Sequence, residues 1–372
     1  MLLAAVGDVM LGDSALLLGR GVRSTCARNG VDFPFACVAP ALRSADVAFC
    51  NLECVLSNVG LDPHSVLSLS MRGLPDSAAG LGRAGFRVVS LANNHAMDHG
   101  RAALMDTASR LVQQGILSVG QPCGKSGPLQ PLVLLVDGFA LGFLAHNLVG
   151  SDSLGDRRSV ISHLPAGVAA ARSACDALVV SLHWGDEYMA VPAPWQVELA
   201  HRIIDAGASL VCGHHPHVLQ PVERFRHGLI AYSLGNFVCD MRWGVTSHSA
   251  VLLVDLTRNG VGAVQMLPIE LNRRWQPVVS LKTPKCYSFK QMLSAETRDL
   301  AMATRPSGGG SKRYLPTAII LRFRYRVHLA LDVCAALARY SLVWKLQILR
   351  CLLRRPREGD PATGFQPRRC AT

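Results

Sequence analysis

Short apolar runs alternate with amphipathic segments along the first 270 residues, and many of the runs end at a glycine or a polar side chain. Runs such as Leu2–Val6 and Leu210–Cys212 have the length and composition of buried strands. Trp195–Ala206 has apolar residues at helical spacing and is followed by Gly207, which is typical of an amphipathic helix and its end. Strands and helices alternate in the first half, and hairpin signals gather in the second. The pattern therefore predicts an α/β fold with mixed sheets.

The pattern changes after residue 272 and divides the chain into four predicted parts. Residues 1–272 form the α/β domain, and residues 273–311 form an irregular segment that ends in a Gly/Ser linker. Residues 312–355 are predicted to be a basic amphipathic helical tail, and residues 356–372 a disordered C-terminus. Two interpretations of the tail are open: it lies on a membrane surface or a partner, or it packs as a helical hairpin on the core. Charges interrupt its apolar stretch, so no membrane-spanning helix is predicted.

Charge and cysteine content narrow the expected partners and compartment. The 372 residues carry a formal net charge of +12, much of it after residue 310, and no nucleic-acid-binding module is recognisable before residue 270. Nucleic acid is therefore not an expected partner, which leaves an anionic membrane surface or a polyanionic substrate. The 12 cysteines form no C-x-x-C pair, and Asp8 follows Met1 too closely for a signal peptide. We expect a cytoplasmic or cytoplasmic membrane-associated protein with reduced thiols, or an extracellular one if the start is wrongly assigned.

Polar side chains at predicted strand ends carry the candidate chemistry. Because open α/β sheets bind ligands at the carboxyl ends of their strands, we expect these side chains to gather at one sheet edge. Carboxylate, amide and imidazole groups together suit one or two divalent ions of Mn, Fe or Zn. The candidate metal ligands are Asp8, Glu53, Asn94, His183, His215 and His217.

The segment Gly213–His217 gives the clearest metal signal, because a buried run ends at a glycine and three histidines follow. Pro216 is predicted to hold His215 in an extended conformation, from which His215 and His217 converge on a metal ion. The alternative is a pair of hydrogen-bonded surface histidines.

Other polar residues are candidates for catalysis or substrate binding. His95 is a candidate general acid beside the predicted ligand Asn94. Asp98 has two interpretations: it suits the N-cap of a helix through residues 101–114, and it is a catalytic candidate beside His95. The candidate substrate-binding residues are Arg72, Asn93 and Glu187. The simpler alternatives are a solvated arginine for Arg72 and an Asx-type turn for Asn93.

Six segments resemble, in content and order, the motifs of the bacterial capsule synthesis protein family of the CapA type, which is linked to poly-γ-glutamate capsule production. That family belongs to the calcineurin-like metallophosphatase superfamily. The resemblance covers residues 3–270 and leaves the basic tail outside it. The segments are Val6–Gly12, Asn51–Glu53, Ser90–Gly100, His183–Gly185, Gly213–His217 and Ser233–Phe237.

The resemblance implies a four-layer α-β-β-α sandwich with a site for two metal ions. Asp8 would hold the first ion, and Glu53 would bridge both. Asn94 and His183 would bind the second ion. His215 and His217 would be divided between the two, with His95 as the general acid.

The chain departs from the wider phosphatase pattern at two positions and from the capsule family in a third respect. Met10 stands where histidine is usual, and Glu53 stands where aspartate is usual. The first ion would then lack a ligand, so binding of one ion or weak binding of two stays open, with His214 as an alternative ligand. The amino-terminal anchor that is usual in the family is not visible, and the basic tail is an alternative means of membrane attachment.

Three functions fit these features. The first is metal-dependent hydrolysis of a phosphoester in the assembly of a capsule or another polyanion. The second is a non-catalytic accessory role, in which the domain binds an anionic polymer or a membrane-bound synthase complex. The third is metal-dependent cleavage of γ-glutamyl amide bonds, because the same ligands can polarise a carbonyl group.

Overall fold

The computed structural model describes residues 1–120, 130–149, 157–241, 243–280, 327, 333–334, 338 and 340–353. The predicted linker, most of the predicted tail and the predicted disordered C-terminus lie outside the described residues. The domain boundaries proposed from the sequence stay predictions.

The first sheet has eight strands, and β1 lies at its centre. Strand β1 pairs in parallel with β2 on one side and antiparallel with β14 on the other, and the short β13 also pairs in parallel with it. The strand order is β16-β15-β14-β1-β2-β5-β6. The strands are β1 (Leu2–Val9), β2 (Val47–Leu52), β5 (Phe86–Ser90), β6 (Leu117–Val119), β13 (Asn236–Val238), β14 (His248–Thr257), β15 (Gly260–Leu271) and β16 (Pro277–Val279).

The second sheet has six strands in the order β11-β12-β10-β9-β8-β7. Its central strands β8, β9, β10 and β12 are parallel, and antiparallel strands close both edges. The strands are β7 (Leu132–Val136), β8 (Phe139–Asn147), β9 (Ala177–His183), β10 (Leu210–His214), β11 (Val222–Phe225) and β12 (Gly228–Ala231). A separate two-stranded sheet joins β3 (Val55–Leu56) and β4 (Arg72–Gly73).

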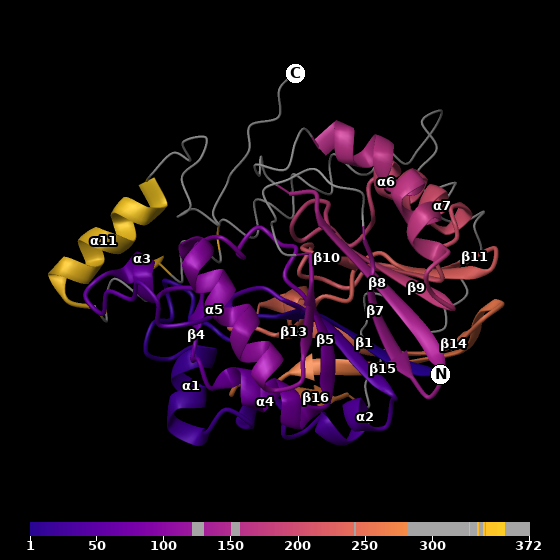
Figure 1. Ribbon diagram of the computed structural model, residues 1–372. Helices are drawn as coiled ribbons and strands as arrows, with labels where there is room; N and C mark the ends of the chain where they lie inside the picture. The colour runs from indigo at the N-terminus through magenta and orange to yellow at the C-terminus, as the bar shows by residue number, and fades with distance from the viewer. Residues whose placement is uncertain are drawn as a thin grey trace.

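Helices cover the outer face of each sheet, so that the described domain has four layers (Figure 1). Helices α1, α2, α4 and α5 pack on the first sheet, whereas α6 and α7 pack on the second. Between the sheets lies a third apolar layer, in which Phe49 of β2 stacks on Phe143 of β8. This arrangement confirms the predicted α-β-β-α class. The helices are α1 (Val22–Asn29), α2 (Ala39–Arg43), α3 (Val66–Leu69), α4 (Ser77–Ala84), α5 (Gly100–Gln113), α6 (Arg157–Arg172) and α7 (Pro194–Asp205).

The central strands read as unbroken apolar runs because both of their faces are buried. In β1, Leu3 and Ala5 face the second sheet, whereas Ala4 and Val6 face the helices. Successive side chains of a strand point to opposite faces, so a strand between two apolar layers has no solvent-facing position for a polar residue until it ends.

Helix α6 is longer than the sequence predicts. The Ser, Asp, Gly and Arg content of residues 150–163 predicts a loop, and Pro165–Cys175 is predicted to be helical, but α6 begins at Arg157 and contains Pro165. This prediction was wrong because packing outweighs the loss of one backbone hydrogen bond at proline. Leu164, Val168 and Ala171 form a buried stripe against the second sheet.

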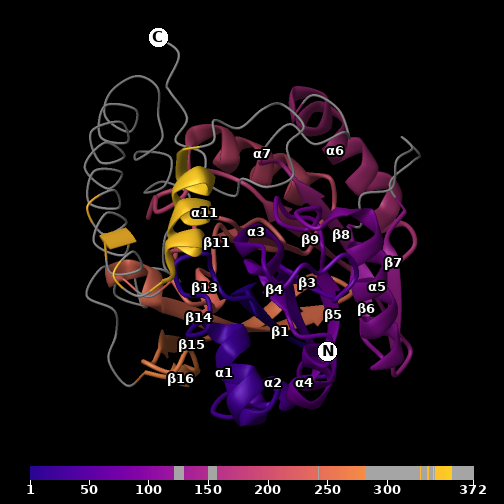
Figure 2. The same cartoon turned by 90° about the vertical axis from the view of Figure 1, so that its left-hand side faces the viewer.

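The final described helix, α11 (Leu342–Leu353), packs beside α3 (Figures 1 and 2). Ile348 is fully buried against Leu18 and Val66, and the hydroxyl of Tyr340 donates hydrogen bonds to the carbonyls of Leu16 and Leu18. This part of the predicted tail therefore packs on the domain. Among the described helices, none combines the length and apolarity needed to cross a membrane.

Neighbouring atoms lie so close to Gly213 in β10 that a larger residue there is expected to destabilise the fold. A Cβ atom there would lie 1.9 Å from the carbonyl oxygen of Tyr232 and 2.6 Å from Nε1 of Trp184. We predict that Gly213→Ala lowers the free energy of unfolding by about 1–3 kcal/mol or more, because the backbone cannot give way without moving the strand. The measurement is denaturant-induced unfolding.

Gly82→Ala is the matched control, since a Cβ atom at this position in α4 would meet nothing closer than 3.3 Å. Its expected change is within about 1 kcal/mol, because alanine favours the helix. Equal stability of Gly213→Ala and wild type would contradict the geometry of β10.

Candidate metal centre

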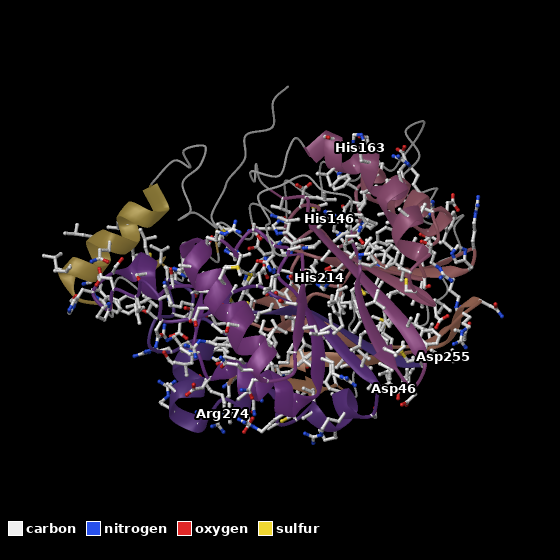
Figure 3. The ribbon with its side chains drawn as sticks, in the orientation of Figure 1. Asp46, His146, His163, His214, Asp255 and Arg274 are labelled. Atoms are coloured by element: carbon white, nitrogen blue, oxygen red, sulfur yellow. The ribbon has the colours of Figure 1, made fainter. Side chains whose placement is uncertain are left out.

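The six predicted metal ligands meet where strand ends of the two sheets face each other. Strands β1, β2 and β5 of the first sheet run parallel, as do β9 and β10 of the second, so their carboxyl ends lie on the same side. The backbone N–H of His215 donates to Oδ2 of Asp8 at 3.2 Å, which joins the two sheets at this point. His214, at the end of β10, lies near the middle of the molecule (Figure 3). The residues that meet here are Asp8, Glu53, Asn94, His183, His215 and His217.

Two groups of candidate ligand atoms adjoin each other through Glu53. Glu53, His183 and His215 form one group, and Asp8, Glu53 and His217 form the other; in each, the atoms lie within 4.8 Å of one another. All five side chains are buried. A carboxylate common to both groups has the position of a bridging ligand, and this role of Glu53 stays a prediction.

Amide side chains connect the two groups. Oδ1 of Asn94 lies 2.7 Å from Nε2 of His183, which also lies 3.4 Å from Oε1 of Glu53. Asn51, at the end of β2, donates from Nδ2 to Oδ1 of Asp8 at 2.9 Å and lies 3.3 Å from Nδ1 of His183. The position of Asn51 two residues before Glu53 predicts that it orients Glu53 or caps a turn. Its contacts instead orient Asp8 of the first sheet and His183 of the second.

His95 and Asp98 form a close pair beside Asn94. Nδ1 of His95 lies 2.7 Å from Oδ2 of Asp98, and the His95 backbone N–H donates to Oδ1 of Asn93. Burial lowers the pKa of His95, but the neighbouring Asp98 carboxylate outweighs burial and raises it to about 9. In the metal-free protein the imidazole is therefore protonated at neutral pH.

The prediction that Asp98 is the N-cap of the following helix was wrong. Helix α5 begins at Gly100, its N-cap residue is His99, and no side chain caps it. The Asp98 carboxylate contacts His95 instead. A hydrogen bond between a carboxylate and an imidazolium is stronger than one between a carboxylate and a backbone N–H, because both partners are charged.

Burial and mutual charge shift the pKa values of the ligands in opposite directions. Burial and the charge of Asp8 raise the pKa of Glu53 to about 8. Burial alone would also raise the pKa of Asp8, but hydrogen bonds from His214 and His217 hold it well below its usual value. The pKa of His217, lowered by burial, is raised by Glu53 and Asp8 to about 10, whereas burial and His215 lower that of His183.

The loop that carries the histidines has an unusual backbone. His215 has φ 94° and His217 has φ 58°, and Tyr188 in the neighbouring loop has φ 65°. The prediction of an extended His215 was therefore wrong. The Tyr188 N–H donates to the carbonyl of Pro216 at 2.8 Å, so hydrogen bonds between the loops hold conformations that cost about 1–3 kcal/mol each.

The donor set fits a cation. Oε1 of Glu53 and Nε2 of His214 are buried without a hydrogen-bond partner among the described residues. Nδ1 of His214 lies 3.1 Å from Oδ1 of Asp8, where an imidazole can orient a carboxylate ligand. A buried carboxylate oxygen without a hydrogen bond is costly unless a cation or a proton compensates it. The clustered carboxylates and imidazoles are therefore suited to bind metal.

Arg72 is part of the fold's internal hydrogen bonding. Its guanidinium group is buried and donates to the backbone carbonyls of Ser57, Val59 and Ser68. These contacts support neither a solvated arginine nor a substrate-binding one, because the guanidinium group donates its hydrogen bonds to the segment between β3 and β4.

The other two substrate-binding candidates lie beside the ligand cluster. Asn93 donates from Nδ2 to Oδ1 of Asn51 and to the carbonyl of Leu52, so its amide group supports the residues that hold the ligands. Glu187 lies with His215 and His217 in a third group whose ligand atoms are within 4.8 Å of one another. Their roles toward a substrate stay predictions.

Asn236 is a residue whose role sequence reasoning missed. It begins β13, pairs with Asp8 in the sheet, and its Oδ1 lies 2.9 Å from Nδ1 of His217. Nδ1 of His217 also lies 3.5 Å from Oδ2 of Asp8, so Asn236 and Asp8 together fix the orientation of the ring. The motif Ser233–Phe237 was the only signal for it in the sequence.

Comparison with known proteins identifies relatives over most of the chain. The family model for "Bacterial capsule synthesis protein PGA_cap" matches residues 2–241. The "PGA biosynthesis protein CapA" of Bacillus subtilis (strain 168) is 31% identical over 275 residues, which are 72% of this chain and 70% of that protein. The "Capsule biosynthesis protein CapA" of Bacillus anthracis is 29% identical over 296 residues, 76% of this chain and 72% of that protein. A crystal structure of a hypothetical protein from Thermus thermophilus aligns with 18% identity and a TM-score of 0.48, over 73% of this chain and 99% of that one.

Metal binding is predicted to release protons and to strengthen as pH rises. Below pH 8, Glu53 and His217 of the metal-free protein carry protons that a metal ion must displace, because their pKa values are raised to about 8 and about 10. Affinity for Mn²⁺ should therefore increase about tenfold per pH unit for each displaced proton. Calorimetry at pH 7 in buffers of different ionisation enthalpy counts the protons released, and we expect between about one and two.

His163→Gln is the control, because this exposed histidine lies on the outer helix α6, away from His214 (Figure 3). It should match wild type in affinity and proton release. Binding with no proton release would contradict the charge arrangement described for Glu53 and His217.

Proposed function

The chain belongs to the bacterial capsule synthesis protein family, and we propose that it is a metal-dependent hydrolase of phosphoester bonds that serves the assembly of a poly-γ-glutamate capsule or a similar polyanion. The proposal takes its biological setting from the relatives, which are named for PGA and capsule biosynthesis. It takes its chemistry from the residues of the site.

The single observation that carries the hydrolytic proposal is the His95–Asp98 pair beside the ligand cluster. A bound divalent ion of Mn, Fe or Zn, alone or as one of a pair, would supply a nucleophilic hydroxide and withdraw charge from the phosphoryl oxygens. Asp98 holds the His95 ring through Nδ1 and keeps it protonated, so Nε2 is the atom that can donate a proton to the leaving oxygen.

A non-catalytic accessory role is the second candidate, and Met10 is the observation that favours it. The residue at this position follows Asp8 by two, and its side chain is buried in the apolar layer under the helices. It therefore adds no ligand to the site. In this alternative the domain binds an anionic polymer or a membrane-bound synthase complex without cleaving a bond.

The exposed face of α11 supports an additional contact with an anionic membrane surface. Leu342, Val343 and Leu346 are 71%, 63% and 49% exposed, although α11 packs on the domain through its opposite face. Residues 312–357 contain many lysines and arginines and a single acidic residue, Asp332. Apolar side chains among basic ones are the combination that binds the headgroup region of an anionic bilayer.

Loss of the general acid is predicted to abolish most of the hydrolytic activity. With Mn²⁺ and bis(4-nitrophenyl) phosphate, His95→Gln should lower kcat about 10²–10⁴-fold, since a positioned proton donor contributes a factor of that order. Asp98→Asn should lower the pKa of His95 and move the alkaline limb of the pH–rate profile to lower pH, because the carboxylate that holds the proton is gone. His163→Gln is the control and should retain wild-type kinetics.

The same assay separates the three functions. Hydrolysis of γ-glutamyl 4-nitroanilide with no cleavage of the phosphodiester would replace the phosphoesterase proposal by the amidase alternative. Metal binding with no hydrolysis of either compound, together with binding of poly-γ-glutamate that survives His95→Gln, would support the accessory role.

The membrane contact makes a separate prediction. Replacing Leu342, Val343 and Leu346 together by serine should weaken binding of the full chain to phosphatidylglycerol-containing vesicles at least tenfold, because burial of each such side chain contributes up to about 1.5–3 kcal/mol. Co-sedimentation with anionic and with purely zwitterionic vesicles is the measurement. The control replaces the exposed Val112 and Leu135 by serine. Equal binding of both variants would argue against α11 as the contact.

A further inference from the structure

The ion position next to Asp8 has fewer ligands than its neighbour. Asp8, Glu53 and His217 converge there, whereas the neighbouring position has the Asn94 oxygen in addition to three ligands. Mn²⁺, Fe²⁺ and Zn²⁺ sites take four or more ligands. Since the Met10 side chain lies in the core on the helix side, the missing donor must come from another element.

The loop after β9 brings a carboxylate to this side of the cluster. Glu187 follows the ligand His183 by four residues, and the positive φ of Gly185 (88°) and Tyr188 (65°) turns the intervening chain back over the site. The hydrogen bond from the Tyr188 N–H to the carbonyl of Pro216 joins the loop that carries Glu187 to the histidine loop. A carboxylate oxygen of Glu187 thereby comes within 4.8 Å of ring nitrogens of His215 and His217.

We propose that Glu187 is an additional metal ligand, which acts with His215 and His217 and adjoins the ion position formed by Asp8, Glu53 and His217. The inference rests on the proposed metal-dependent function and adds a residue to it. The group of Glu187 shares His217 with the Asp8 group and His215 with the neighbouring group, so it adjoins both.

Charge balance supports this role. Two divalent ions in a buried site leave a large uncompensated positive charge if Asp8 and Glu53 are the only carboxylates, and a third carboxylate reduces it. Glu187 is only partly buried, so its approach to an ion costs less desolvation than that of Asp8.

The test is metal binding by the full chain in the variant Glu187→Gln. Titration with Mn²⁺, followed by calorimetry and electron paramagnetic resonance, should show two ions in wild type, with the spectrum of a coupled pair. Glu187→Gln should retain one ion at wild-type affinity, lose at least tenfold in affinity for the other, and give the six-line spectrum of isolated Mn²⁺. Glu198→Gln, which changes an exposed carboxylate on α7, is the matched control and should bind as wild type does.

The outcomes separate this inference from the function on which it rests. Two ions bound equally well by Glu187→Gln and wild type would overturn the role of Glu187 and leave the hydrolase proposal standing. A wild-type chain that binds no Mn²⁺, Zn²⁺ or Fe²⁺ would overturn both. Glu187→Asp, which keeps the carboxylate but shortens its reach, should recover part of the lost affinity, whereas a purely structural role would not require the charge.

Discussion

The Asp8 carboxylate is the interaction on which the site depends, because it joins the two sheets at their shared end. One oxygen accepts a hydrogen bond from Asn51 of the neighbouring strand, and the other accepts one from the backbone of His215 in the second sheet. A buried carboxylate is stable only if such partners compensate for lost hydration. His214 and His217 also lie beside the Asp8 carboxylate. Their hydrogen bonds hold the pKa of Asp8 low. The cluster is therefore both a binding site and a junction of the fold.

The apolar layers make this junction rigid. The sheet-to-sheet core fixes the distance between β2 and β8, and the helices outside fix the orientation of each sheet. Strand ends that are held in this way bring Asp8, Glu53 and His183 close together. The positive-φ residues His215, His217 and Tyr188 lie at the edge of that frame, where hydrogen bonds between loops stabilise conformations that are unfavourable in isolation.

Several site residues were predictable from the sequence, and others were not, for physical reasons. A carboxylate or an imidazole at the end of a buried strand is a local signal, so Asp8, Glu53 and His183 could be identified one strand at a time. The position of Arg72 could not be derived locally, since its carbonyl partners lie in a loop whose path depends on tertiary packing. Asp98 was assigned to a helix cap because propensity favours that position, whereas the folded chain offers it a charged partner. Pro165 was assigned to a helix start by the same kind of local rule.

The sequence by itself determined the alternation of buried strands and amphipathic helices, the family to which the chain belongs, and the set of polar residues at strand ends. These features are local, because periodicity and short motifs act within one element or one turn. Only the tertiary structure decided which strand ends face each other, that Glu53 lies in two ligand groups, and that Glu187 lies beside His215 and His217. Those relations depend on the pairing and packing of strands that are far apart along the chain, and no local pattern encodes the distance between them.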